Sequence, residues 1–199
     1  MTTARDLTVV VLGLPAERPV ARGDLSLALA GAEAIDLLES GALSLDGDHM
    51  VPGPPSATGD RLLDEAAVSL TRREPYDTVA EWLWRRGGEL AAAYAGDLER
   101  EGLVVRPRGH FGFRSAHTVL GDSPARRTAE ERRAAGEPVL AALLAAAGIE
   151  VERDEAAESL TGDAVTTVLA AVGDAVTQLE AVRLRRDVEN AAFDNVWRA

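Results

Sequence analysis

The chain has 199 residues, a formal net charge of −12 and no cysteine. The lack of cysteine excludes disulfides, thiolate catalysis and Cys-based zinc sites, and the acidic balance disfavours nucleic acid and anionic lipid as ligands unless positive charge is gathered locally. Apolar residues make up 46% of the chain and aromatic residues only 4%, which favours closely packed helices over a β-sandwich.

The N-terminal region begins with an apolar, β-branched run at residues 7–14, which fits either a short strand or the first turns of a buried helix. A polar loop that contains Arg18 and Arg22 follows over residues 15–23. We recognise no secretory signal here, and no apolar run of about 18 residues is free of charge, so a membrane span is not expected. A cytoplasmic protein is the resulting expectation.

Residues 24–45 predict the helix around which the rest of the chain packs. Apolar residues recur at three- and four-residue steps and cover nearly the whole circumference, which is typical of a helix inside a bundle. We expect Asp24 to cap this helix and Gly41 to end it. The alternating residues after Gly41 predict a short strand, and Asp46-Gly47 predicts a hairpin turn.

Further helices are predicted along the chain after a loop at residues 51–57. We expect Thr58 to cap the next helix, with Asp60 in its first turn and Arg72-Arg73 at its end. Asp77 or Thr78 is expected to cap the next helix, at about residues 78–86. Later helices are expected at about residues 89–100, 124–137 and 138–148.

A long final helix is predicted after Thr161, its expected cap. Its apolar residues follow steps of three and four: Val165, Val168, Val172, Ala175, Leu179 and Val182. One interpretation is that this stripe packs against a helix of a partner protein. It covers fewer than three heptads, however, which favours a helix internal to the bundle.

Positive charge is concentrated in residues 104–133, which hold seven arginines and three acidic residues. Their net charge is +4, so the other residues carry −16. Residues 95–113, which lead into this region, repeat the plan of residues 34–51: a helix that ends at glycine, a strand, a polar turn and a second strand. This second turn is basic and bears two phenylalanines: Arg106, Arg108, Arg114, Phe111 and Phe113.

This basic hairpin suggests contact with an anionic surface. Guanidinium groups bind phosphate oxygens bidentately, and exposed phenylalanines enter lipid interfaces. The alternative is a solvated loop whose phenylalanines pack on the bundle.

No catalytic or metal site is predicted. Asp60, Asp64 and Glu65 lack a neighbouring histidine and fit a helix cap and a solvated face. The three histidines do not have zinc-ligand spacing, and hydrolase, metalloprotease and nucleotide-binding motifs are absent. We therefore expect a protein that is not an enzyme and needs no cofactor.

Residues 97–115 also fit the recognition helix and wing of a winged helix-turn-helix. A DNA-reading helix normally carries a basic stripe. Here it carries Asp97, Glu99 and Glu101 against Arg100, so a nucleic-acid-binding regulator is the less favoured alternative.

Three segments resemble the Golgi phosphoprotein 3 family: LALAGAEAIDLLESGALSL, then ATGDRLLDEA with DTVAEWL after it, then DLEREGLV. TGDxLLDEA is the most specific of them, and the order matches over nearly the whole chain. The resemblance implies one mainly α-helical domain over residues 1–199, with a central apolar helix ringed by others and a projecting β-hairpin. The segment LVVRPRGHFGFRS looks like that hairpin.

Eukaryotic members of this family are peripheral proteins of the cytoplasmic Golgi face that bind phosphatidylinositol 4-phosphate and membrane glycosyltransferases. The family's headgroup tryptophan and arginines fall on Ala21 and Ala30 and near Gly88 and Ala91 of this chain, so that pocket does not carry over. Arg22, Arg85 and Arg86 lie close to those positions and could supply a different anion site. The lysine-free, alanine- and arginine-rich composition is typical of a GC-rich bacterium, where that lipid is not expected.

The sequence thus predicts a non-enzymatic adaptor that binds an anionic phospholipid or another phosphate-bearing ligand, in the cytoplasm or at the inner face of the membrane. Membrane enzymes such as glycosyltransferases are the partners that the resemblance implies. A further alternative is an interaction module that forms homo-oligomers through the hairpin.

Overall fold

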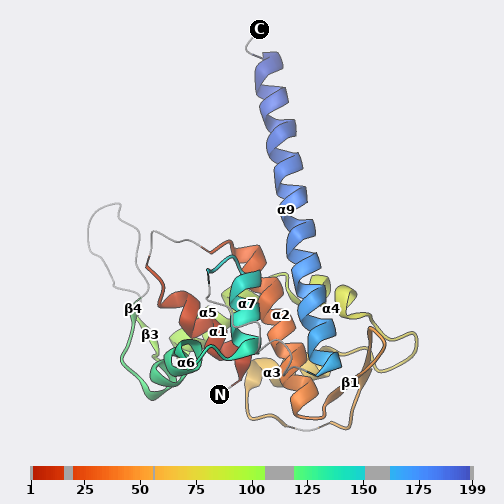
Figure 1. The fold of residues 1–199 in the computed structure, drawn as a ribbon, viewed down its shortest axis with the longest axis vertical. Coiled ribbons are helices and arrows are strands. Elements are labelled where there is room, and N and C mark those ends of the chain that lie inside the picture. The colour runs from red at the N-terminus through yellow and green to blue at the C-terminus, as the bar shows by residue number, and fades with distance from the viewer. Residues whose placement is uncertain (1, 16–19, 56, 106–118, 151–161, 198–199) are drawn as a thin grey trace.

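The computed structural model describes residues 2–15, 20–55, 57–105, 119–150 and 162–197, and they form a helical bundle with two small antiparallel hairpins (Figure 1). The prediction of a mainly helical fold is confirmed. The helices are α1 (Thr3–Leu12), α2 (Arg22–Glu39), α3 (Arg61–Ser69), α4 (Val79–Arg86), α5 (Leu90–Arg100), α6 (Pro124–Ala134), α7 (Pro138–Ala146) and α9 (Asp163–Trp197). The strands are β1 (Leu43–Asp46), β2 (His49–Pro52), β3 (Val104–Val105) and β4 (Val119–Leu120).

Helix α2 lies at the centre of the bundle, as its all-round apolar sequence predicts. Every residue from Leu25 to Leu37 is buried, and α1, α3, α4, α5, α7 and α9 all pack on it. The start of the helix differs from the prediction. Ala21 is the N-cap residue and forms no side-chain cap, whereas Asp24 lies within the first turn and binds Arg183 of α9 through its carboxylate.

The end of α2 and the hairpin after it follow the predicted turn chemistry. Gly41 has a φ of +72°, the left-handed conformation that glycine adopts at least cost after a helix. Strands β1 and β2 pair from Leu43 with Pro52 to Asp46 with His49. The turn between them contains Gly47 with a φ of +62°.

The N-terminal apolar run belongs to helix α1, which settles the choice between helix and strand. Its N-terminus is held by α2: Asp36 accepts hydrogen bonds from the backbone amides of Thr3 at 2.9 Å and Ala4 at 3.2 Å. A carboxylate at this end of α1 satisfies amide groups that have no partner within the helix.

Helix α9 packs on α2, α4 and α7 through the first half of its length. Val168, Val172 and Ala175 are buried, which confirms the internal role predicted for this stripe, but Val182 is exposed. By length and composition alone, residues 163–190 could cross a membrane. The same segment supplies part of the core of the bundle.

Candidate functional site

The family-like motif TGDxLLDEA forms the start of helix α3. The carboxylate of Asp60 accepts hydrogen bonds from the amides of Leu62 at 3.0 Å and Leu63 at 3.1 Å, so Asp60 is the N-cap residue. The prediction that Thr58 caps this helix is wrong. Thr58 instead binds Asp64 through its hydroxyl and its amide, and these hydrogen bonds lower the pKa of the Asp64 carboxyl.

The end of α3 also differs from the prediction. The helix stops at Ser69, and Leu70 after it is extended. Arg72 and Arg73 therefore lie beyond the helix, where Arg72 donates hydrogen bonds to the carbonyls of Gly53 and Ala67.

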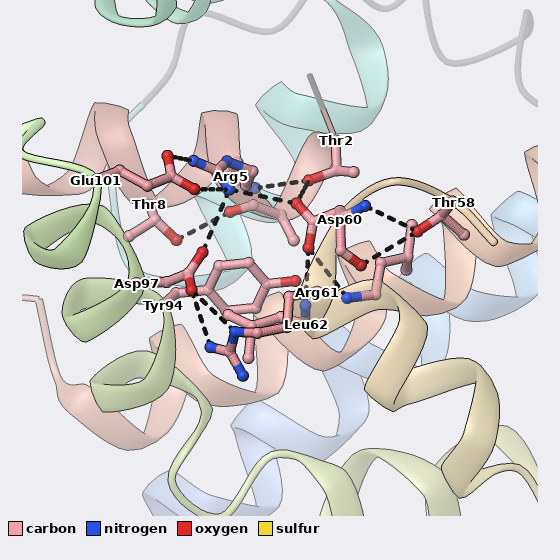
Figure 2. A network of polar contacts seen from close by, with 12 residues as sticks. Thr2, Arg5, Thr8, Thr58, Asp60, Arg61, Leu62, Tyr94, Asp97 and Glu101 are labelled. Carbon is pink, nitrogen blue, oxygen red and sulfur yellow. Dashed lines mark hydrogen bonds and ion pairs between the residues drawn. The ribbon is translucent and has the colours of Figure 1, made fainter.

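Ion pairs connect the start of α3 to α1 and α5 (Figure 2). Arg5 of α1 lies 3.6 Å from Asp60 and 3.3 Å from Asp97, and it also binds Glu101. Asp97 is further bound by Arg61 at 2.8 Å and by Arg100 at 2.7 Å. Burial opposes ionisation of Asp97, but the hydrogen bond from Arg61 and the surrounding positive charge lower its pKa.

A second buried cluster joins α2, α4 and α5. Both oxygens of Glu33 are bound by Arg86, at 2.8 and 2.9 Å, and one accepts the hydroxyl of Tyr94 at 3.1 Å. Burial raises the pKa of Glu33, and burial together with the charge of Glu33 raises the pKa of Tyr94. Arg86 also donates to the carbonyl of Leu62, so the cluster reaches α3 as well.

The three arginines expected to supply an anion site have separate environments. The side chain of Arg86 is 17% exposed and its partner Glu33 is fully buried, so this ion pair removes Arg86 from the candidate anion ligands. Arg85 binds Asp77 and the carbonyl of Ser69 and lies 5.4 Å from the ring centre of Trp82. Arg22 is exposed at the start of α2.

The basic hairpin is described only at its base. Val104 pairs with Leu120 and Val105 with Val119, in antiparallel orientation. The residues expected to contact an anionic surface lie outside the described residues: Arg106, Arg108, Arg114, Phe111 and Phe113.

The other arginines of the positive region lie on α6 and mostly have partners within the chain. Arg126 binds Glu130 at 2.7 Å, and Arg127 binds Asp122 at 2.7 Å. Arg132 binds the buried Asp6 of α1 and also Glu137. The α6 part of the positive region is therefore largely neutralised by carboxylates of the chain itself.

Helix α5 packs one face against the bundle. Leu90, Ala91, Tyr94, Asp97 and Leu98 are buried, and α5 packs against α1 and α2. This arrangement gives no support to the winged-helix alternative.

The acidic residues at the start of α3 are likewise engaged by the protein. Asp60 caps the helix, Asp64 binds Thr58 and Glu65 binds Arg61. A shallow surface pocket of about 640 Å³ lies over this helix and is lined by Gly59, Arg61, Asp64, Glu65, Val68 and Ser69. Its lining includes two carboxylates, and the guanidinium of Arg61 is paired with Glu65 and Asp97, so the pocket does not suit an anionic ligand.

Sequence reasoning missed the buried polar clusters. For the cluster of α2, α4 and α5, the signal was the presence of Glu33 within an otherwise apolar helix, because a carboxylate buried in a bundle needs partners. The partners Arg5, Arg86 and Tyr94 come from other helices, so spacing along the chain could not reveal them.

The sequence of the whole chain was compared with models of protein families. The model of the Golgi phosphoprotein 3 (GPP34) family matches residues 4–195, nearly the whole chain. A search of the curated proteins gives no match. The chain therefore belongs to the Golgi phosphoprotein 3 family.

Proposed function

We propose that this protein is a peripheral, non-enzymatic binding protein that attaches to phosphate-bearing surfaces through its β3–β4 hairpin. The ligand that fits the hairpin's chemistry is an anionic phospholipid headgroup at the inner face of a membrane. Membrane enzymes such as glycosyltransferases would then be the partners that this attachment brings within reach.

The antiparallel base of the hairpin carries this proposal. The pairing of Val104 with Leu120 holds side by side the two strands that lead into and out of residues 106–118. That segment contains three arginines, two phenylalanines and no acidic residue, whereas the chain as a whole has a net charge of −12. Guanidinium groups and aromatic side chains are suited to headgroup phosphates and to the lipid interface, respectively.

Ion pairs within the chain occupy several of the arginines outside this hairpin. Arg86, Arg126, Arg127 and Arg132 are each bound by carboxylates of the chain. Each arginine near an anionic membrane surface contributes about 1 kcal/mol, so three give weak and reversible attachment that salt weakens.

Liposome flotation of the full chain tests the proposal. We expect the protein to float with vesicles that contain anionic lipid at low salt, to stay behind with neutral vesicles, and to be released as salt increases. Absence of flotation with anionic vesicles at low salt would contradict the proposal.

A pair of double variants tests the site. Arg106→Ser with Arg108→Ser is expected to reduce flotation by at least about tenfold, which corresponds to about 1.4 kcal/mol. The control is Arg72→Ser with Arg73→Ser, which removes the same charge from two exposed residues outside the hairpin. Equal losses in the two double variants would show that total charge, and not the hairpin, governs attachment.

A further inference from the structure

The second half of helix α9 extends away from the bundle (Figure 1). Residues 180–190 are all exposed except Arg183, whose guanidinium lies 2.7 Å from the carboxylate of Asp24 in α2. A helical segment without packing is only marginally stable in water. Residues 184–190 are all exposed, so packing on the described bundle does not stabilise this part of the helix.

A stripe of small and apolar residues runs along α9 on the side that faces away from the bundle. It consists of Ala170, Gly173, Thr177, Ala181, Leu184 and Val188. At about 100° per residue, Val188 lies half a turn around the helix from Leu179, which packs on the core. Leu184 is 60% exposed and Val188 is 69% exposed, and both are among the largest exposed apolar side chains of the described residues.

The stripe repeats every eleven residues: Ala170 corresponds to Ala181, Gly173 to Leu184 and Thr177 to Val188. Eleven residues make three turns of a nearly straight helix, so the stripe stays on one side along its whole length. The stripe could therefore form one continuous contact with a second helix.

The charged residues beside the stripe favour a second copy of α9 as the partner, in parallel orientation. Glu180 and Arg185 flank the stripe on opposite sides, and neither forms an ion pair with another described residue. Over residues 177–188 the stripe has steps of four, three and four, as in a coiled coil. In two parallel helices with this spacing, a residue on one side of the contact faces the residue five positions later on the other helix. Glu180 of each copy would then meet Arg185 of the other, which gives two attractive pairs.

The antiparallel register that packs Leu184 on Val188 brings like charges together. If Leu184 of one copy packs on Val188 of the other in antiparallel orientation, Arg185 faces Arg185 and Asp187 faces Asp187. We propose that the outward face of α9 is a dimer interface, on which a second copy of this chain packs its own α9 in parallel.

Gly173 supports a close approach of the two helices. A side chain added at this position would have no atom within 4 Å, so nothing in the described bundle requires a glycine there. Glycine is less favourable than alanine inside a helix. A partner helix that packs closely at this position would account for it.

Sedimentation equilibrium of the full chain tests the proposal. We expect a reversible monomer–dimer equilibrium, which Leu184→Glu with Val188→Glu shifts to monomer by at least tenfold in Kd. The matched control is Val68→Glu, which adds a charge at an apolar residue of α3 that is 79% exposed, and should leave Kd unchanged. A wild-type chain that stays monomeric, or a dimer that survives the double variant, would overturn the proposal.

Charge exchange tests the parallel orientation. Glu180→Arg and Arg185→Glu should each weaken the dimer, and the double variant should restore it. The natural chain has no cysteine, so Ala181→Cys and Val188→Cys should each give a disulfide-linked dimer, whereas Glu189→Cys, off the stripe, should not. Failure of either stripe cysteine to cross-link, or failure of the double charge exchange to restore Kd, would exclude the parallel arrangement.

Gly173→Ala separates folding from association. We expect it to raise the thermal midpoint of the diluted monomer, because alanine favours the helix, and to increase Kd, because its methyl group holds the helices apart. If Gly173 mattered only for the fold of the monomer, Gly173→Ala would leave Kd unchanged. Since the proposed contact is formed by α9 alone, Arg106→Ser with Arg108→Ser should leave Kd unchanged too, so the dimer and membrane attachment are tested independently.

Discussion

Glu33 of α2 and Arg86 of α4 form a bidentate ion pair inside the bundle, with hydrogen bonds of 2.8 and 2.9 Å. Tyr94 of α5 binds the same carboxylate, and Arg86 also binds the carbonyl of Leu62 in α3. One ion pair therefore fixes the relative positions of four helices. The family-like motif at the start of α3 lies at one end of this network, which gives the motif a structural role.

Arg86→Met is expected to lower the free energy of unfolding by about 3–5 kcal/mol, because it leaves the carboxylate of Glu33 buried without a counter-charge. Glu33→Leu together with Arg86→Met should recover much of this loss, because both charges are then absent. Urea unfolding followed by circular dichroism measures each value.

The neighbouring Arg85 is the control for this prediction. Its side chain is 43% exposed and binds Asp77 near the surface. Arg85→Met should cost less than about 1 kcal/mol, because water screens an exposed ion pair. Similar losses for the two arginines would contradict the structural role assigned to the buried pair.

Asp60 has two separable roles, as N-cap of α3 and as partner of Arg5. Asp60→Ser retains a capping oxygen but removes the charge, whereas Asp60→Ala removes both. We expect Asp60→Ala to cost at least about 1–2 kcal/mol and Asp60→Ser to cost less, because serine is a good N-cap. Equal losses in urea unfolding would show that the cap contributes little.

Periodicity predicted most of the helices because their apolar faces are encoded locally. The burial of α2 and the turn at Gly41 follow from residue spacing and from the conformational freedom of glycine. The caps were less predictable. Thr58 and Asp60 are two positions apart, and both residue types are good N-caps. Asp60 is the N-cap because its carboxylate accepts the hydrogen bonds of the Leu62 and Leu63 amides.

The candidate arginines show what local sequence cannot supply. Arg85 and Arg86 are adjacent in the chain, yet one lies at the surface and the other pairs with Glu33, 53 positions earlier. Whether an arginine is available to a ligand depends on carboxylates from other helices, and these are known only once the helices are packed. Likewise, the free face of α9 becomes visible only when its other face is seen against α2.

Asp36 should make stability depend on pH. Burial raises its pKa from 3.8 to about 6. The native state holds the Asp36 proton more tightly than the unfolded state does. The resulting stabilisation of the native state is fully present below about pH 4 and is lost as the pH rises through about 6. The unfolding free energy of the wild type, minus that of Asp36→Asn, should therefore fall by about 3 kcal/mol between about pH 4 and 7.

Asp64 is the control for this pH dependence because its pKa shifts the other way. Hydrogen bonds from Thr58 lower that pKa, so the ionised carboxylate stabilises the native state above the ordinary value of 3.8. The difference between wild type and Asp64→Asn should decrease as the pH falls below about 4. If the Asp36 difference rose with pH instead, the helix dipole of α1 would outweigh burial at that carboxylate.

Two helical glycines should respond in opposite directions to substitution by alanine. A methyl group on Gly31 of α2 would lie 2.4 Å from Val172 Cγ2 of α9, whereas one on Gly96 of α5 would have no atom within 4 Å. Gly31→Ala should cost about 1–3 kcal/mol through overpacking. Gly96→Ala should stabilise the fold by up to about 1 kcal/mol, because alanine is the better helix former.

Val172→Ala tests whether the cost at Gly31 arises from that contact. Alone, it should destabilise the protein by opening a cavity between α2 and α9. Combined with Gly31→Ala, it makes room for the new methyl group, so the double variant should lose less stability than the sum of the two single losses. Additive losses in urea unfolding would mean that α2 and α9 do not approach at Gly31 as closely as the structure places them.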